Sequence, residues 1–181
     1  IYNRLFAFVK SNLNSKSTMK VIKKLIPLSL LLFSNCLIYG QGNIEDVEKK
    51  NVLTVIESYK NALQNLTTKG TFELFTDDAL VYEQGKVEGT YTDYIDNHLG
   101  PELGHFKSFT FSDYNVNVSV NLPYAYTTED YLYTIVLKED PERGITERTI
   151  NSKGVATSIL QKIDGEWKII HSHTSFKKLK Q

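Results

Sequence analysis

Cysteine is nearly absent from this chain: its 181 residues include a single one, Cys36. Because Cys36 precedes the part of the chain that we expect to fold, the folded domain has neither disulfides nor thiol chemistry. The chain also lacks a glycine-rich phosphate-binding loop, a Gly-x-Ser-x-Gly motif and zinc-finger spacing of Cys and His. These absences remove the site types that are most easily identified from a motif.

Acidic residues are missing from the first forty positions, which contain six Lys and Arg. Since the whole chain has 21 basic and 21 acidic residues, the remainder has 15 basic against 21 acidic. A nucleic-acid-binding face needs clustered positive charge to neutralise phosphates. The mildly acidic remainder therefore predicts no nucleic-acid partner.

A long hydrophobic run is missing too. The most apolar stretch, Leu25–Phe33, is much shorter than the roughly 20 residues needed to cross a bilayer, and Pro27 interrupts it. It follows Met19 and a lysine-rich segment, so we interpret residues 19–40 as a signal peptide, with cleavage after Gly40, and predict no membrane span. The location predicted for the mature protein is periplasmic or secreted.

Two alternatives concern this leader. One is a lipid anchor at Cys36, although Asn35 is larger than the residue that usually precedes a lipidated cysteine. Residues 1–18 precede Met19, and we interpret them as a non-native or upstream extension, with a longer targeting region as the alternative. Residues 41–181 are then one domain, because this length suits a single core.

Hydrophobic periodicity outlines the elements of that domain. Apolar residues from Val52 to Leu66 recur at helical spacing and predict a long helix over 45–66. A short helix is expected at 72–75 and a third from Thr90, which forms a capping box with Asp93, to a stop at Gly100-Pro101. Strands are predicted at 79–83, 87–88, 106–120, 124–138, 145–162 and 166–176.

The predicted strands are too long for a flat sheet. They exceed the usual five or six residues, so a compact domain needs a strongly curved antiparallel sheet, with Gly154 as a bulge or bend. Such a sheet wrapped around the long N-terminal helix encloses a cone-shaped cavity. The fold class predicted is an α+β roll with a pocket.

Three segments resemble a known superfamily. They are the long first helix, the Phe72–Tyr82 segment and the final strand, Asp164–Ser175. Together they resemble the nuclear transport factor 2-like superfamily, and within it the SnoaL-like domains, over about residues 47–176. The resemblance implies an α+β roll with a deep pocket and, often, a homodimer formed through the sheet. It leaves function open, because members are isomerases, cyclases, hydrolases or binding modules.

The final strand has the strongest candidates for chemistry. Alternation puts His171 and His173 on the same face as Trp167 and Ile169, so we expect both histidines to line the cavity. Such a His-x-His pair suits a divalent metal such as zinc. The predicted metal ligands are His98, His105, His171 and His173, with Glu83 or Glu102 as a carboxylate ligand.

Without a metal, the same histidines would either hydrogen-bond to neighbours or act as catalytic acids or bases. The predicted catalytic set is His171, His173 and Glu83. Tyrosine is abundant, and alternation places Tyr124 and Tyr126 on one face and Tyr131 and Tyr133 on the other, so one pair suits a dimer interface. Candidate ligand contacts are Tyr59, Tyr82, Glu129, Tyr131, Tyr133 and Trp167.

The function predicted is binding of a small, partly apolar molecule in the pocket. A pocket enzyme of hydrolase, isomerase or cyclase type, using the histidines with or without a divalent metal, is the alternative. A third possibility is a dimer that uses only the outer face of the sheet.

Overall fold

The computed structural model describes residues 44–144 and 146–180. The leader predicted at 19–40, with Cys36, and the extension predicted at 1–18 lie outside these residues. One compact unit spans Val47–Gln181, and the account below concerns this unit. Its elements in chain order are a helix over 44–64, η1 (Phe72–Leu74), β1 (Phe75–Glu83), β2 (Lys86–Thr90), α3 (Tyr91–Tyr94), η2 (Ile95–Leu99), α4 (Gly100–His105), β3 (Phe106–Asn121), β4 (Tyr124–Leu137), η3 (Pro141–Arg143), β5 (Arg148–Ile163) and β6 (Glu166–Lys178).

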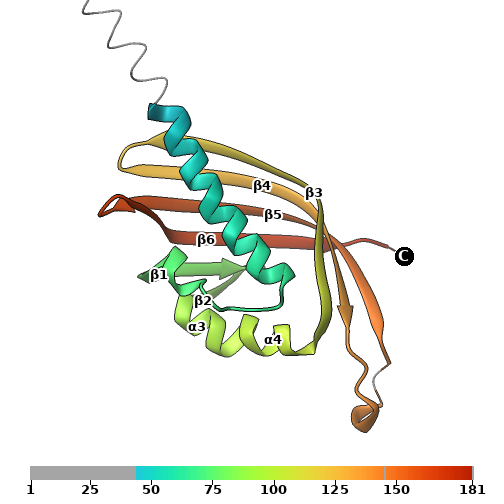
Figure 1. Ribbon diagram of the computed structural model, residues 1–181. Helices are drawn as coiled ribbons and strands as arrows, with labels where there is room; N and C mark the ends of the chain where they lie inside the picture. Colours follow the sequence, from blue (N-terminus) through green and yellow to red (C-terminus); the bar gives the residue numbers. More distant parts are fainter. Residues whose placement is uncertain (1–43, 145, 181) are drawn as a thin grey trace, which may run out of the picture. The chain divides into compact units, whose positions relative to one another are not determined.

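Six strands form a single sheet in the order β2-β1-β6-β5-β4-β3. All neighbours are antiparallel except β1 and β6, which are parallel. The predicted α+β fold with a strongly curved antiparallel sheet is confirmed, and the parallel pairing of β1 with β6 is a feature that the sequence did not predict. The parallel pairing joins the first hairpin to the last strand and brings the end of β1 beside the middle of β6 (Figure 1).

The long helix lies across one face of the sheet (Figure 1). The predicted apolar stripe faces the sheet: Val52 and Ile56 are buried, and Tyr59 and Leu63 are half-buried. At the other end of the core, Trp167 donates a hydrogen bond from Nε1 to Glu48 Oε2 at 2.8 Å. Glu48 also pairs with Lys162 at 2.6 Å, so the start of the helix is bound to the β5–β6 hairpin.

The third helix continues past the stop predicted at Gly100-Pro101. The capping box of Thr90 and Asp93 is present, but a π turn, η2, follows α3, and Gly100 donates its N–H to the Ile95 carbonyl five residues earlier. Pro101 then lies in the first turn of α4, which follows η2 without a break. The predicted stop is therefore a change of helix type.

A β-bulge in β6 reverses the facing of its second half. Ile159 pairs with His171 whereas Leu160 pairs with Ile169, so Ile170 is an extra residue. Trp167 and Ile169 are buried before the bulge, and Ser172 is buried after it. Because one inserted residue moves every later side chain to the opposite face, His171 and His173 face away from Trp167 and Ile169.

Two hairpins, β1–β2 and β5–β6, each contain a two-residue turn. Gln84-Gly85 and Asp164-Gly165 both have positive φ at their two central residues, as type I′ turns require. The hairpin predicted at Asp164-Gly165 is therefore confirmed. The first turn places Glu83 at the very end of β1.

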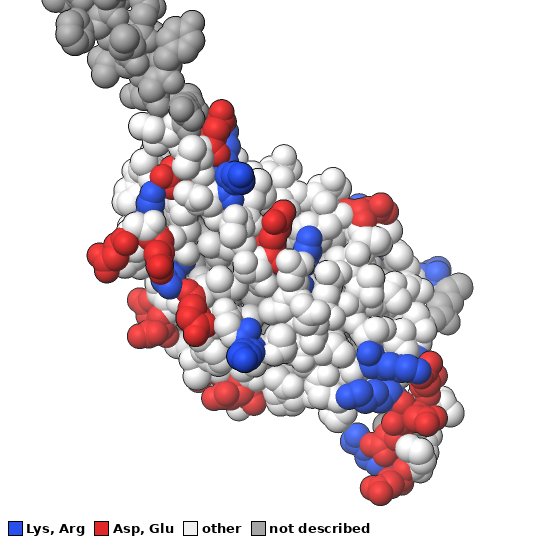
Figure 2. Space-filling model, viewed as in Figure 1, with Lys and Arg blue, Asp and Glu red and all other residues white. Residues whose placement is uncertain are grey.

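Charged side chains are sparse over the middle of the face seen in Figure 2. At the end that carries η3, basic and acidic side chains are intermixed rather than gathered by sign (Figure 2). None of the helices that the structure describes is apolar over a length sufficient to span a bilayer.

Candidate functional site

A cavity of about 730 Å³ lies among the long helix, the sheet and the helical segment α3–α4. Pockets of this size hold drug-sized organic molecules. Its main lining residues are Ile56, Tyr59, Lys60, Leu63, Glu83, Glu88, Tyr94, His98, Leu99, Glu102, Phe106, Phe109, Phe111, Tyr114, Glu129, Tyr131, Tyr133, Ile135, Ala156, Ser158, Ser172, Thr174 and Phe176.

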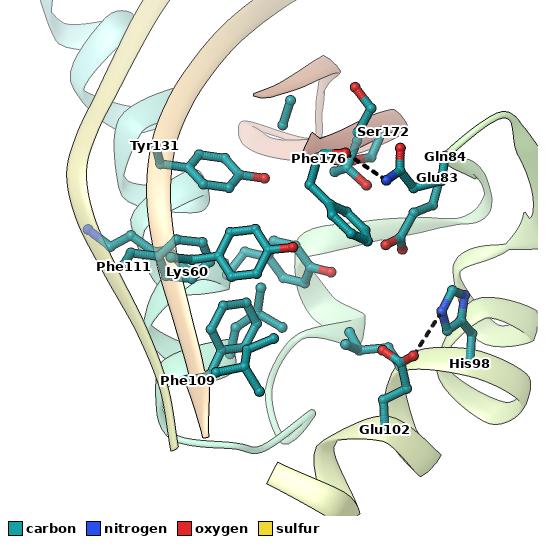
Figure 3. A pocket seen from close by; sticks show the side chains of 18 of the residues that line it. Lys60, Glu83, Gln84, His98, Glu102, Phe109, Phe111, Tyr131, Ser172 and Phe176 are labelled. Atoms are coloured by element: carbon teal, nitrogen blue, oxygen red, sulfur yellow. Dashed lines mark hydrogen bonds and ion pairs between the residues drawn. The ribbon is translucent and has the colours of Figure 1, made fainter. Parts of the chain in front are cut away.

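Aromatic rings from β3 and β4 form one wall of this cavity (Figure 3). Tyr114 and Tyr131 stack with their ring centroids 5.2 Å apart and their planes 12° apart. Phe111 meets Tyr131 edge to face at 5.1 Å, and Phe109 meets Phe111 at 4.7 Å. Packed rings hold one another in place, so this wall is largely formed before a ligand arrives.

Gly154 makes room for this wall. The bulge predicted at Gly154 is absent, because the residue pairs in regular register with Tyr131 on one side and Phe176 on the other. A Cβ on Gly154 would overlap the Tyr131 ring. The glycine therefore allows close packing of an aromatic ring.

Glu129 projects from β4 into the aromatic part of the cavity. Its carboxyl accepts hydrogen bonds from the Tyr114 hydroxyl and from Thr127 Oγ1, the latter at 3.1 Å. Burial raises the pKa of Glu129, and these two hydrogen bonds only partly offset that effect. Burial also raises the pKa of Tyr114, so its hydroxyl stays protonated and keeps donating.

Glu83 lies at the opposite part of the cavity, at the end of β1 (Figure 3). The Tyr94 hydroxyl donates a hydrogen bond to Glu83 Oε2 at 2.7 Å. Burial raises the pKa of Glu83, while the Tyr94 hydrogen bond and the nearby His98 act in the opposite direction. A carboxyl group with a raised pKa can accept or release a proton nearer to neutral pH than an exposed one.

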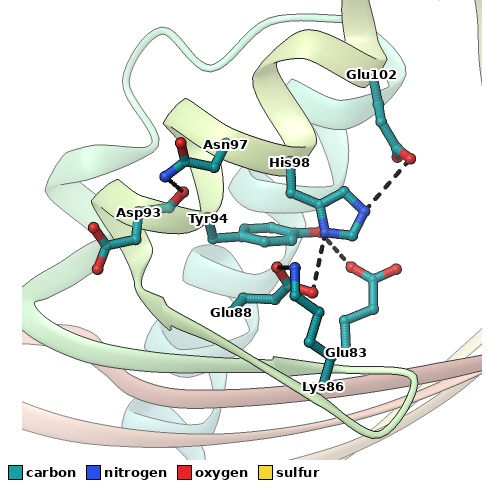
Figure 4. Close-up of polar contacts among 8 residues, drawn as sticks. All are labelled: Glu83, Lys86, Glu88, Asp93, Tyr94, Asn97, His98 and Glu102. Atoms are coloured by element: carbon teal, nitrogen blue, oxygen red, sulfur yellow. Dashed lines mark hydrogen bonds and ion pairs between the residues drawn. The ribbon is translucent and has the colours of Figure 1, made fainter.

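His98 lies between two further carboxylates (Figure 4). Its Nε2 atom is 3.4 Å from Glu102 Oε1, one helical turn later. Its Nδ1 atom is 3.2 Å from Glu88 Oε1, but the geometry is not that of a hydrogen bond, so this contact is electrostatic. Burial acts to raise the pKa of Glu88, yet Lys86 and His98 outweigh it and leave that pKa below its usual value.

Four of the six predicted ligand contacts line the cavity: Tyr59, Glu129, Tyr131 and Tyr133. The predicted alternation along β4 is confirmed as well, since Tyr131 and Tyr133 face inward while Tyr124 and Tyr126 are 48% and 53% exposed on the other face. Glu83, predicted as catalytic, also lines the cavity. The functional roles of all these residues stay predictions.

Four other predicted placements are wrong. His171 and His173 lie on the outer face of the sheet beside Tyr82, whose ring centroid is 5.1 Å from that of His171, and none of the three lines the cavity. Their inward facing was inferred from strict alternation, which the bulge at Ile170 breaks. Trp167 is buried in the core against Glu48 and does not line the main cavity either.

The predicted metal set is not assembled. His98 is the only one of the chain's four histidines that lines the cavity, and His105 is exposed at the end of α4. Within the described residues, no group of three or more His, Cys, Asp or Glu side chains is placed to hold a metal ion. The geometry therefore does not fit the zinc site inferred from the histidine spacing.

Several important cavity residues were not singled out from the sequence. Tyr94 comes from a short helix, and Tyr114 lies within an irregularity in the pairing of β3 with β4, between Ser112 and Asn115. Phe176 points into the cavity because of the β6 bulge. Asp113 has a positive φ, which Asp tolerates better than most residues. The presence of Asp at this position is therefore the sequence signal for the irregularity near Tyr114.

A curved six-stranded sheet with a helix across it and an aromatic cavity containing half-buried carboxyl groups defines the cone-shaped α+β class. The family model of the SnoaL-like domain matches residues 52–177. The chain therefore belongs to the SnoaL-like domain family. Its fold is the one found in nuclear transport factor 2-like proteins.

Solved structures support the same fold. A nuclear transport factor 2-like superfamily protein from Salmonella enterica is 17% identical, with a TM-score of 0.61 over 75% of this chain and 94% of that one. A ketosteroid isomerase-like protein from Erwinia carotovora is 14% identical, with a TM-score of 0.58 over 74% of this chain and 98% of that one. A hexachlorocyclohexane dehydrochlorinase is 16% identical, with a TM-score of 0.59 over 74% and 90%.

These identities are low, so the likeness concerns the fold alone. No functionally curated protein matches the sequence.

Proposed function

We propose that this domain binds a small, largely apolar organic molecule in the cavity between the long helix and the sheet. The observation that supports this most directly is the preformed aromatic wall of about five rings next to two half-buried carboxyl groups, in a cavity of about 730 Å³. Aromatic walls supply affinity for apolar ligands, and a few polar groups orient them.

A cavity-filling variant tests this proposal. Ala156 on β5 lines the cavity, whereas its neighbour Thr157 faces outward. Ala156→Phe should block binding of neutral aromatic compounds such as 1-naphthol and 4-tert-butylphenol, measured by isothermal titration, and Thr157→Phe should not. Native mass spectrometry would reveal any ligand carried through purification. Binding that survives Ala156→Phe would contradict the proposal.

Proton transfer is a second candidate function, favoured by the Glu83 arrangement. Its carboxyl faces the cavity, has a raised pKa and receives a hydrogen bond from Tyr94. Such a group can remove a proton from bound substrate in an isomerisation or elimination. Turnover that vanishes in Glu83→Gln while the substrate still binds would favour an enzyme over a binding module. The histidines of β6 have no role in this proposed proton transfer.

For the partner, we propose a second copy of the chain docked on the outer face of the sheet. Large apolar side chains are exposed there, including Tyr126 at 53%, Val155 at 47% and Ile159 at 39%. Neighbouring strands place Tyr126 directly beside Ile159. Light scattering should give a dimer mass for the native chain and a monomer mass for Ile159→Lys; a native monomer would exclude this partner.

For the location, we propose export to the periplasm or the medium with removal of residues 19–40. The support is the lysine-rich segment followed by a short apolar run. Expression in a bacterial host followed by N-terminal sequencing of the exported protein should find Gln41 first. A diacylglyceryl group on Cys36 would instead establish the lipid anchor.

A further inference from the structure

The charge inside the cavity is unbalanced. Glu83 and Glu129 both line it, and the hydrogen-bond donors that they contact are hydroxyl groups: Tyr94 for Glu83, and Tyr114 and Thr127 for Glu129. Among the residues that the structure describes, no Lys or Arg lies within salt-bridge distance of either carboxyl. Two half-buried carboxyl groups thus lack a Lys or Arg partner, and His98 is the basic side chain that acts on Glu83.

The basic residues of the lining are directed elsewhere. The Lys86 side chain is 69% exposed and pairs with Glu88 at 2.7 Å. Lys60 lies over the ring of Tyr114, with Nζ 4.8 Å from the ring centroid. Arg148 and Lys178 are exposed. Three of these cations are exposed and the half-buried Lys60 is engaged with the Tyr114 ring, so none of the four pairs with Glu83 or Glu129.

Aromatic faces lie next to these carboxyl groups. Figure 3 shows the Phe176 ring and the Glu83 carboxyl pointing into the same part of the cavity, with Tyr131 on the far side. An aromatic face attracts a positive charge through its quadrupole, and the attraction grows when the site excludes water. A carboxylate beside aromatic rings therefore provides both interactions that stabilise a desolvated organic cation.

We propose that the ligand is an organic cation, an ammonium group attached to an apolar body, whose charge lies between Glu83 and Phe176. This inference rests on the proposed binding function and specifies its ligand class. The apolar body extends along the aromatic wall toward Tyr131. An anionic ligand is disfavoured, because Glu83, Glu88 and Glu102 would repel it at this end of the cavity.

The test compares two probes of the same shape that differ in charge. Benzyltrimethylammonium carries a permanent positive charge, and neopentylbenzene replaces its nitrogen with carbon. Titrated into the full chain, the cation should bind at least about tenfold more tightly than the neutral probe. Ala156→Phe, which fills the cavity, should abolish binding of both.

Charge-neutralising variants assign the effect to residues. Glu83→Gln keeps the shape of the side chain and should weaken binding of the cation about tenfold. Neopentylbenzene should bind this variant as it binds the native chain, which shows that the variant is folded. The matched control is Asp130→Asn on the outer face of β4, which should leave both affinities unchanged.

The outcomes separate the two proposals. Equal affinities for the two probes would overturn the cation inference and leave the pocket function standing. Binding of the cation that persists in Ala156→Phe would place it on the surface and would also overturn the inference. Failure of both probes to bind would count against both proposals.

Discussion

Single residues decide the chemistry available in this cavity. Glu83 and Glu129 are carboxyl groups held where burial disfavours their charge, and they accept hydrogen bonds from tyrosine and threonine hydroxyls. Burial also keeps Tyr59 and Tyr94 protonated, since it raises both of their pKa values well above the usual range. The cavity therefore contains hydroxyl donors and carboxyl acceptors, and no Lys or Arg among the described residues pairs with these two carboxyl groups.

Removal of one hydroxyl should change the acidity of Glu83. Tyr94→Phe eliminates the hydrogen bond that lowers the pKa of Glu83, so that pKa should rise further above its usual value. Carbon-13 NMR titration of the Glu83 carboxyl measures it directly.

The control for this measurement is Tyr91→Phe. Tyr91 is as deeply buried, but its hydroxyl donates to Thr71. This variant should leave the titration of Glu83 where it is in the native chain. An unchanged Glu83 in Tyr94→Phe would show that the hydrogen bond is not formed in solution.

At the scale of elements, irregularities in the strands decide which side chains reach the cavity. The extra residue Ile170 turns Ser172, Thr174 and Phe176 inward and His171 outward. In β5, by contrast, regular pairing places Gly154 beneath the Tyr131 ring. The side chains that face the cavity are therefore taken from one face of the strand before a bulge and from the other face after it.

Gly154→Ala should destabilise the domain through the packing of β4 against β5. The added Cβ overlaps the Tyr131 ring, and overpacking of this kind costs about 1–3 kcal/mol. Urea unfolding followed by circular dichroism measures the change in the free energy of unfolding.

A double mutant identifies the cause. In a Tyr131→Ala background the ring is gone, so Gly154→Ala should cost much less than in the native chain. If the two effects simply add, the loss comes from the backbone of Gly154 rather than from the ring.

At the scale of the whole molecule, the buried carboxyl groups link stability to pH. The folded-state pKa of Glu129 is raised, so over the interval above its unfolded pKa the folded chain binds more protons than the unfolded one. The stabilising contribution of Glu129 to the free energy of unfolding is therefore fully present below its unfolded-state pKa, and it is lost as pH rises through its folded-state pKa.

Glu129→Gln should reveal this dependence, because glutamine stays neutral at every pH and retains an oxygen that can accept a hydrogen bond from the Tyr114 hydroxyl. The melting temperature of the variant relative to the native chain should increase as pH rises from about 4 to about 8. Asp130→Asn, on the outer face of the same strand, provides the reference. A difference that is constant with pH would contradict the raised pKa.

Short-range features were predictable from the sequence because their causes lie within a few residues. The Thr90–Asp93 capping box and the turn at Asp164-Gly165 depend on local hydrogen bonds and backbone conformation. The two faces of β4 follow from simple alternation, which correctly placed Tyr131 and Tyr133 in the cavity. The family resemblance also rested on such patterns.

The sequence by itself therefore determined the class of fold, the inward face of β4 and the presence of a cavity, because periodicity encodes which side of an element is buried. Only the tertiary structure decided which residues form the site. The parallel pairing of β1 with β6 placed Glu83 beside Thr174, and the bulge at Ile170 removed His171 and His173 from the interior. A bulge reverses which side chains face the cavity in the rest of the strand, but the alternation of residue types does not show where it lies. Only the pairing with neighbouring strands reveals the bulge.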